Sequence, residues 1–220
     1  LYAGASSLWR TTNARASSVT WSVVKPATTS KISALAISPS NGNVMWVAHN
    51  DGRIYRSANA TAATPTWVPV DDNAGLDPMP NRYVTRLTID PTNDNVVWAT
   101  LGGFASGNVR VTRDGGLTWN DASGIAPRRL PDAPVNCIVL HPDDPDVLYV
   151  GTEVGVFASD DAGAHWSANN DGPSNAAVEQ VVFEQGSRKL IAATLGRGLW
   201  TCAVHRPSLT TFGVGCSGNP

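Results

Sequence analysis

The chain has 220 residues, of which 42% are hydrophobic and 15% are charged, and its formal net charge at pH 7 is −2. This composition excludes an intrinsically disordered chain, and the balanced charge gives no reason to expect a nucleic acid or an anionic membrane as partner. No apolar run is long enough to span a bilayer. The sequence begins at Leu1 without a methionine, so we expect either a processed leader or a piece of a longer polypeptide.

Short strand-like segments recur along the chain in a fixed order. Inner strands are predicted at residues 32–39, 84–91, 135–142 and 178–183, second strands at 44–48, 96–100, 147–151 and 190–194, and third strands at segments such as 155–159 and 198–202. They are rich in β-branched and aromatic residues and bounded by Gly, Pro, Asn and Asp, which is typical of strands and turns. Repeats of about 48 residues, each with four short antiparallel strands, predict the blades of a β-propeller.

A turn motif of the form S/T-x-D-x-G-x-x-W joins the third and fourth strands in two of the repeats. The two copies consist of Thr112, Asp114, Gly116 and Trp119, and of Ser159, Asp161, Gly163 and Trp166. We expect the Asp to accept main-chain N–H groups, the Gly to adopt a positive φ, and the Trp to fold back and plug the hairpin against the next blade.

Two weaker copies of the motif precede these. They run from Thr11 through Asn13 to Trp21, and from Ser57 through Asn59 to Trp67. In both, Asn replaces Asp, the Gly is missing, and the Trp lies three residues later than in the intact copies. The four Trp are spaced by 46, 52 and 47 residues, which is the length of a blade.

These motifs resemble the Asp-box, or BNR, repeats of a superfamily that includes sialidases, xyloglucan-degrading glycosidases, sortilin-type receptors and photosystem II assembly factors. The resemblance covers residues 1–205 and implies an all-β propeller of four-stranded blades. It implies little about activity, because the box is a structural hairpin that enzymes and non-enzymes share. We assign residues 1–205 to propeller blades and residues 206–220 to a C-terminal tail.

The two ends of the repeat array are predicted to be incomplete. The first four residues align with a second strand, so the first blade lacks an inner strand, and residues 199–204 form a third strand with no box after it. About five blades are therefore present. We interpret them as the C-terminal part of a six- to eight-bladed propeller, and keep a compact five-bladed ring as the alternative.

Candidate ligand residues are expected on the face opposite the boxes, where two long loops and several short turns lie. The candidates are Asp71, Asp72, Asp77, Arg82, Arg128, Arg129, Glu153 and Arg197. Two carboxylates are needed to hydrolyse a glycosidic bond, and an arginine cluster can hold a carboxylate. The alternative is that these are solvated loop charges and local turn caps. The sequence predicts no metal site and no cofactor, because the four His lie on different repeats without ligand spacing.

The three cysteines predict one disulfide. Cys202 ends the last strand and Cys216 lies in the tail, so we expect them to pair and to anchor the tail over the open edge of the last sheet. Cys137 lies in the middle of an inner strand and is expected to be a buried thiol. Three reduced thiols are the alternative.

The interpretation favoured by the sequence is a secreted, non-catalytic propeller that binds a protein or a glycan, or acts as a scaffold. Its expected partners include the remaining blades of the same propeller. The alternative is a fragment of a sialidase- or xyloglucanase-like glycoside hydrolase, acting on extracellular polysaccharide, whose acid and base lie partly outside this chain. An enzyme should place two loop-face carboxylates across a cleft, whereas a binding module should expose aromatic or apolar side chains there.

Overall fold

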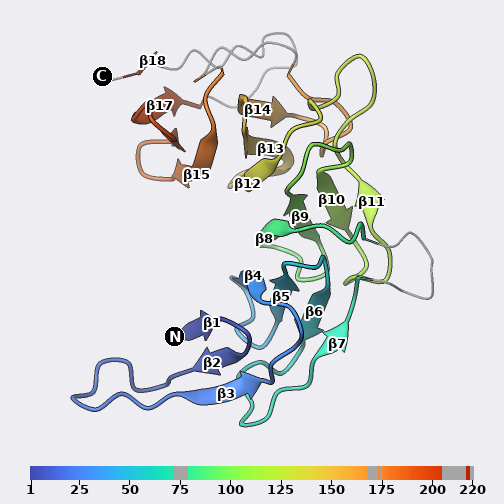
Figure 1. The fold of residues 1–220 in the computed structure, drawn as a ribbon. Coiled ribbons are helices and arrows are strands. Elements are labelled where there is room, and N and C mark those ends of the chain that lie inside the picture. Colours follow the sequence, from blue (N-terminus) through green and yellow to red (C-terminus); the bar gives the residue numbers. More distant parts are fainter. Residues whose placement is uncertain (72–78, 168–172, 174, 205–216, 219–220) are drawn as a thin grey trace. The chain divides into compact units, whose positions relative to one another are not determined.

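The fold is described from a computed structural model, which covers residues 1–71, 79–167, 173, 175–204 and the strand 217–218. These residues contain 18 strands in five antiparallel sheets, and no α-helix (Figure 1). The prediction of about 18 strands in five sheets is confirmed. Within the described part of the chain, no helix is long and apolar enough to cross a membrane.

Each sheet is a meander in which consecutive strands pair. The first three sheets contain β1 (Tyr2–Gly4), β2 (Leu8–Arg10) and β3 (Ser22–Lys25); β4 (Ile32–Ile37), β5 (Met45–His49), β6 (Ile54–Ser57) and β7 (Val68–Pro69); and β8 (Val84–Ile89), β9 (Val97–Leu101), β10 (Val109–Thr112) and β11 (Asn120–Asp121). The last two contain β12 (Val135–His141), β13 (Asp144–Thr152) and β14 (Gly155–Ser159); and β15 (Val178–Glu184), β16 (Lys189–Thr194), β17 (Leu199–Ala203) and β18 (Ser217–Gly218). These sheets are propeller blades, and the chain is a partial β-propeller.

The first and last sheets differ in how they are completed. The first sheet contains only three strands and lacks an inner one, as the sequence predicts. The fifth sheet gains a fourth strand from the tail, because β18 pairs with β17 through Trp200↔Gly218 and Thr201↔Ser217. The tail therefore covers a sheet edge for which the repeat pattern supplies no strand. Cys202 is buried, while Cys216 lies outside the described residues, so the predicted disulfide stays a prediction.

The chain divides into two compact units, and the division passes through the third sheet. Unit 1 comprises residues 1–98 and 112–119, and unit 2 comprises residues 99–111 and 120–220. In unit 1, the apolar core includes Leu8 and Val24 from the first sheet and Met45 and Val47 from the second. Burying these side chains between two sheets removes apolar surface from water and stabilises the sheet pair.

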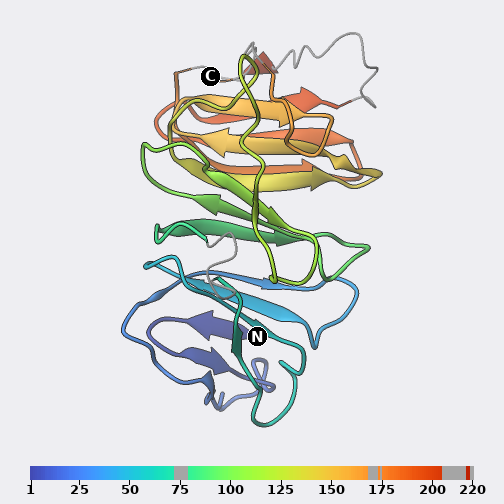
Figure 2. The same cartoon turned by 90° about the vertical axis from the view of Figure 1, so that its right-hand side faces the viewer.

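In unit 2, the fourth and fifth sheets lie side by side and share a second core (Figure 2). It contains Tyr149 and Val178, together with Cys137, whose side chain is fully buried. The main-chain N–H of Val181 points at the Cys137 sulfur over 3.1 Å. Burial of Cys137 is therefore confirmed, and the residue behaves here as a small core side chain.

The two intact boxes have the same hydrogen bonds. In the first, the Thr112 hydroxyl donates to Asp114 Oδ1 over 2.8 Å and accepts the N–H of Gly116 over 2.8 Å, and the N–H of Thr118 donates to Asp114 Oδ1 over 2.9 Å. The second box repeats this set with Ser159, Asp161, Gly163 and His165. The side chains of the motif therefore replace strand pairing at the point where the chain reverses.

The tryptophans that end the boxes contact the preceding sheet, and not the next one as the sequence analysis expected. The indole N–H of Trp119 donates to the carbonyl of Val70 over 2.6 Å, and that of Trp166 to the carbonyl of Ala122 over 2.9 Å. Both side chains are buried, and Trp119 also packs edge-on against Trp46. The direction follows from the acceptors, because the carbonyls of Val70 and Ala122 lie just after the last strands of the preceding sheets.

Candidate functional site

Every complete sheet has two ends that carry different connections. We call the end with the hairpins between third and fourth strands, such as β6–β7 and β10–β11, the box end. The hairpins between second and third strands, such as β5–β6 and β9–β10, and the connections to the next sheet lie at the opposite end, here the loop end. Because neighbouring strands are antiparallel, successive connections alternate between these ends. Those predicted ligand residues that the structure describes all belong to the loop end.

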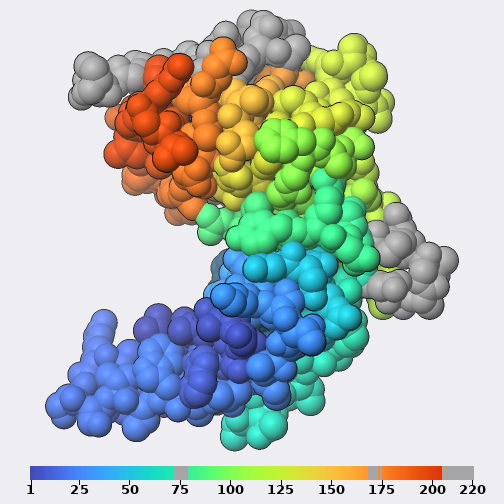
Figure 3. All heavy atoms as spheres, viewed as in Figure 1, coloured from blue at the N-terminus to red at the C-terminus, as the bar shows by residue number. Residues whose placement is uncertain are grey.

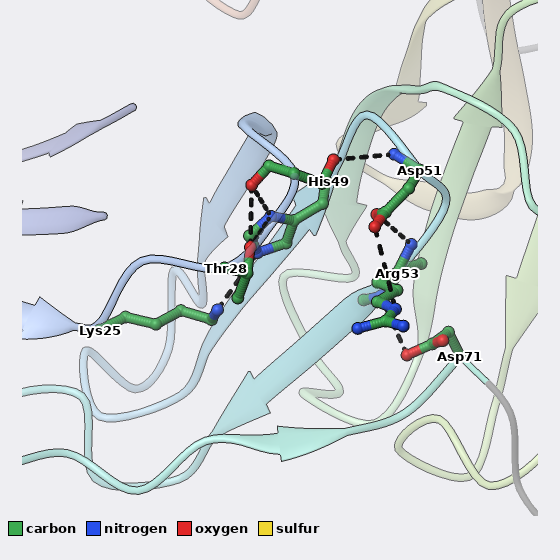
Figure 4. Close-up of polar contacts among 8 residues, drawn as sticks. Lys25, Thr28, His49, Asp51, Arg53 and Asp71 are labelled. Carbon is green, nitrogen blue, oxygen red and sulfur yellow. Dashed lines mark hydrogen bonds and ion pairs between the residues drawn. The ribbon is translucent and has the colours of Figure 1, made fainter. Parts of the chain in front are cut away.

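In unit 1, three charged side chains gather at the loop end of the second sheet. Asp51 and Arg53 flank the tip of the β5–β6 turn, with Nε and Oδ2 3.8 Å apart, and about half of the Arg53 side chain is exposed. Asp71 begins the long connection after β7 and also acts electrostatically on Arg53. Figure 4 shows the Arg53 side chain between those of Asp51 and Asp71. A guanidinium between two carboxylates provides donors and acceptors that can engage sugar hydroxyls or a charged group.

The backbone around this cluster is held by short polar contacts. The Ser30 hydroxyl accepts the N–H of Asp51 over 3.1 Å, and Asp51 Oδ1 accepts the N–H of Arg53 over 3.3 Å. Gly52 has a φ of +90°, and an added Cβ would lie 2.7 Å from the carbonyl oxygen of Pro80. The tight turn therefore requires glycine, and it brings Asp51 close to the segment that carries Arg82.

Asp71 has a structural task in addition to its charge. Its Oδ1 accepts the N–H of Ile54 over 3.1 Å. The carbonyl of Ile54 accepts the N–H of Val70, the residue before Asp71. The carboxylate thus takes the place of a main-chain carbonyl where the β6–β7 pairing ends, which makes Asp71 a local cap. Asp72 and Asp77, which the sequence analysis grouped with it, lie outside the described residues.

Beneath this cluster lies a buried pair of basic side chains that the sequence analysis missed. Lys25, at the end of β3, and His49, at the end of β5, are 3% and 0% exposed, and Nζ is 3.2 Å from Nε2. His49 Nδ1 lies 2.9 Å from the carbonyl oxygen of Ser30, which can only accept, so Nδ1 carries the proton and Nε2 accepts from the ammonium. Figure 4 shows Lys25, Thr28 and His49 converging.

Both members of this pair have shifted pKa values. Burial lowers the pKa of Lys25, against the nearby Asp51 charge, which raises it. Burial also lowers the pKa of His49, and the Lys25 charge lowers it further. The Tyr55 ring centroid lies 3.9 Å from Nζ and provides a favourable face for the cation. The arrangement keeps His49 neutral and positions the β5–β6 turn above it. Its only signal in the sequence is a basic residue that directly follows apolar residues at the end of each of two strands.

In unit 2, the predicted loop-end residues have mostly local partners. Glu153 Oε1 accepts the side-chain N–H of Asn136 over 3.1 Å, and the main-chain N–H of Glu153 bonds Pro134. Arg129 forms an ion pair with Asp132 inside the same connection. Glu153 therefore ties the β13–β14 turn to the start of β12, and Arg129 stabilises its own connection.

The two remaining arginines of unit 2 have exposed side chains, and their main-chain carbonyls accept hydrogen bonds from tryptophans. The carbonyl of Arg128 accepts the main-chain N–H of Trp166 over 2.9 Å, and the carbonyl of Arg197 accepts the Trp200 indole N–H over 3.1 Å. Arg82 belongs to unit 1, apart from the other three in the division of the chain. Among the described residues, no group of three or more His, Cys, Asp and Glu could hold a metal ion.

The loop end also exposes large aromatic side chains. Phe104, in the β9–β10 turn of unit 2, is 79% exposed, and Tyr83, just before β8 in unit 1, is 47% exposed. Exposed aromatic rings suit the stacking of apolar sugar faces, and charged groups at the same end of a sheet can form hydrogen bonds to sugar hydroxyls. Each unit, taken by itself, therefore carries an exposed aromatic side chain and polar groups at the loop ends of its own sheets.

Comparison with known proteins gives two curated relatives. A xyloglucanase from Paenibacillus sp is 26% identical over 184 residues, and an oligoxyloglucan-reducing end-specific xyloglucanase from Emericella nidulans is 23% identical over 143 residues. These matches cover 76% and 61% of this chain, but only 17% of either relative. The chain therefore corresponds to a small part of each relative's length. No family model matches the sequence.

Solved structures share the fold at low sequence identity. The GH74 xyloglucanase of Xanthomonas campestris aligns with a TM-score of 0.57 at 16% identity, over 92% of this chain and 31% of that one. The GH74 enzyme of Niastella koreensis aligns with a TM-score of 0.58 at 18% identity, over 78% and 28%. The extracellular domain of a hybrid two-component system from B. thetaiotaomicron aligns with a TM-score of 0.60 at 13% identity, over 78% and 23%. The chain thus shares its fold with a part of each of these proteins.

Proposed function

We propose that this chain forms part of the propeller of an extracellular glycoside hydrolase that acts on a xyloglucan-type polysaccharide, and that its loop end contacts the glycan. The observation that carries the proposal is the pair of xyloglucanase relatives, which match 61% and 76% of the chain. This favours the interpretation that the sequence analysis held as the alternative. We further propose that the hairpin repeats are Asp-box repeats in the BNR sense, supported by the matching hydrogen bonds of the two intact boxes.

The loop-end geometry supports a binding role for the described residues. Phe104 offers an exposed ring for stacking, and Asp51 and Arg53 offer polar groups for sugar hydroxyls. Asp71 and Glu153 each use a carboxylate oxygen to hold a neighbouring group, so we assign them positioning roles. Hydrolysis needs an acid and a second carboxylate flanking the bond. We propose that this pair is completed by further blades of the same propeller, beyond the residues of this chain.

Affinity electrophoresis tests the binding role. Migration of the chain should be retarded in gels that contain soluble xyloglucan and unchanged in gels that contain mannan. Phe104→Ala and Asp51→Asn should each weaken the retardation. Leu117→Ala is the matched control, because Leu117 is a 58% exposed apolar side chain at the box end. Equal migration with and without xyloglucan would contradict the proposal.

A second candidate is a glycan-binding module without catalysis, and the exposed Phe104 ring at the loop end favours it, because such a ring suits the stacking of a sugar. The two candidates differ in one measurement on the full gene product. A hydrolase releases new reducing ends from xyloglucan. A binding module is retarded in the xyloglucan gel but releases no reducing ends. If Phe104→Ala slows the release of reducing ends and Leu117→Ala does not, the result supports both the hydrolase and a glycan-binding role for the loop end.

A further inference from the structure

The box tryptophans follow a rule that links each repeat to the one before. Trp67, Trp119 and Trp166 donate their indole N–H groups to the carbonyls of Val24, Val70 and Ala122, over 2.8, 2.6 and 2.9 Å. In each case the acceptor lies three residues after the box tryptophan of the preceding repeat. Two of these bonds lie within unit 1 and one within unit 2. The same contact therefore forms independently in both parts of the chain.

Trp21 occupies the same position in the first repeat but has no such acceptor. Its indole N–H has no hydrogen-bond partner among the described residues, and the side chain is 41% exposed, whereas Trp119 and Trp166 are 1% and 2% exposed. An indole with one polar group and a large apolar body usually finds a partner for both. The first sheet thus carries the donor half of the recurring contact without its acceptor.

The two faces of the first sheet also differ in exposure, since one is covered and the other is open to solvent. Leu8 and Val24 are 0% and 4% exposed, because they pack against the second sheet. Trp9 and Val23 are paired across β2 and β3, so their side chains share the opposite face, and they are 40% and 45% exposed. On the second sheet, the face that is directed at the first sheet carries the fully buried Val47. The exposed face of the first sheet therefore corresponds to the face of the second sheet that the first sheet covers.

We propose that the face of the first sheet formed by Trp9, Trp21 and Val23 is a docking surface for a further blade of the same repeat, belonging to the same polypeptide. The main-chain carbonyl three residues after that blade's box tryptophan accepts the Trp21 indole N–H. Three internal copies of this contact fix the kind of occupant and the register. The length of the relatives agrees with a same-chain source, since the matches cover only 17% of each. The connection between β2 and β3, which ends at Trp21, projects from the first sheet (Figure 3).

Hydroxyl-radical footprinting of the full gene product tests this proposal. Trp21 should be oxidised as slowly as Trp67, and several-fold more slowly than the exposed Phe104 in the same sample. Oxidation of Trp21 at the rate of Phe104 would overturn the proposal. Protection of Trp21 that grows with protein concentration would also overturn it, because the occupant would then be a second copy. These outcomes do not depend on whether the protein binds or cleaves xyloglucan.

A matched pair of substitutions isolates the indole N–H. Trp21→Phe and Trp67→Phe each keep an aromatic ring and remove the donor, so both should fold. In the full gene product, the two variants should lower the melting temperature by similar amounts. An unchanged melting temperature for Trp21→Phe, beside a measurable decrease for Trp67→Phe, would show that Trp21 has no acceptor and would overturn the proposal.

Discussion

The first two box hairpins and the last two solve the same turn in different ways. In the early hairpins, Asn13 Oδ1 accepts the N–H of Thr20 and Asn59 Oδ1 accepts that of Thr66, seven residues on in each case. In the late hairpins, Asp114 and Asp161 accept the N–H four residues on. The three extra residues expected from the sequence therefore loop out beyond the same bond. The side-chain acceptor is kept, while the charge and the tight glycine turn are not.

The tighter turn has a consequence for packing. Gly116, with a φ of +94°, leaves no room for a Cβ, which would lie 2.6 Å from the Val70 Cβ and 3.1 Å from the Trp46 ring. This close approach seats Trp119 at 1% exposure, whereas Trp67, after the longer turn, is only partly buried. The late hairpins thus have a more constrained backbone and a more deeply buried tryptophan. We expect them to contribute more to stability than the early ones.

Replacing the box tryptophans by alanine gives the largest expected effect. Trp119→Ala and Trp166→Ala each remove a buried indole and should lower the free energy of unfolding by about 3–5 kcal/mol. Trp67→Ala should cost less, because its ring is only partly buried. In the isolated chain, exposed Trp21 should change stability by less than about 1 kcal/mol when replaced. Denaturant unfolding measures all four, and equal losses for Trp67→Ala and Trp119→Ala would remove the distinction between early and late hairpins.

Glycine substitutions give the next largest effect. Gly116→Ala and Gly163→Ala combine a positive φ with a Cβ only 2.6 Å from a neighbouring atom, and each should cost about 2–4 kcal/mol. Gly196→Ala is the matched control, because its φ is +79° but no atom lies within 4 Å, so only the strain of about 1–2 kcal/mol remains. Thermal melts should rank the variants in this order. A cost for Gly196→Ala as large as that for Gly116→Ala would show that close packing contributes nothing.

The blades were predictable because their signals are local. Strand segments, proline turns and the S/T-x-D-x-G-x-x-W spacing each depend on a few neighbouring residues, and the three-residue insertion could be read from the tryptophan positions alone. The direction in which Trp119 packs was not predictable. It depends on an acceptor, Val70, that lies 49 residues earlier in the chain, and the sequence shows a blade-length spacing without its direction.

The candidate site was less predictable than the fold. The sequence located the loop-end segments, but loop residues such as Asp71 and Glu153 have the same composition whether they bind a ligand or cap a turn. Only the hydrogen bonds to Ile54 and Asn136 separate these roles. The Lys25–His49 pair was missed because its two members lie 24 residues apart on different sheets. The sequence predicted that the tail covers the open edge of the last sheet, but β18 has no repeat pattern from which its register with β17 could be derived.

Acidification distinguishes the two kinds of hairpin with the smallest expected effect. Partial burial raises the pKa of Asp114, but hydrogen bonds from Thr118 and Thr112 outweigh it, so the pKa lies below its ordinary value, and that of Asp161 is lowered in the same way by His165 and Ser159. A depressed carboxyl pKa contributes stability above about pH 4 that is lost as the pH falls through the folded-state value.

Asn13 and Asn59 have no such dependence, since an amide does not titrate. The double variant Asp114→Asn/Asp161→Asn should therefore lose less stability than the unmodified chain between about pH 7 and about pH 3. The reverse variant, Asn13→Asp/Asn59→Asp, should lose more, because it places titrating carboxylates on the same main-chain and hydroxyl donors. Urea unfolding at the two pH values measures both changes. The exposure of the boxes keeps each difference to about 1 kcal/mol or less. Identical acid sensitivity in all three proteins would mean that the carboxylates add only what the amides already supply, and that the early and late hairpins differ in packing alone.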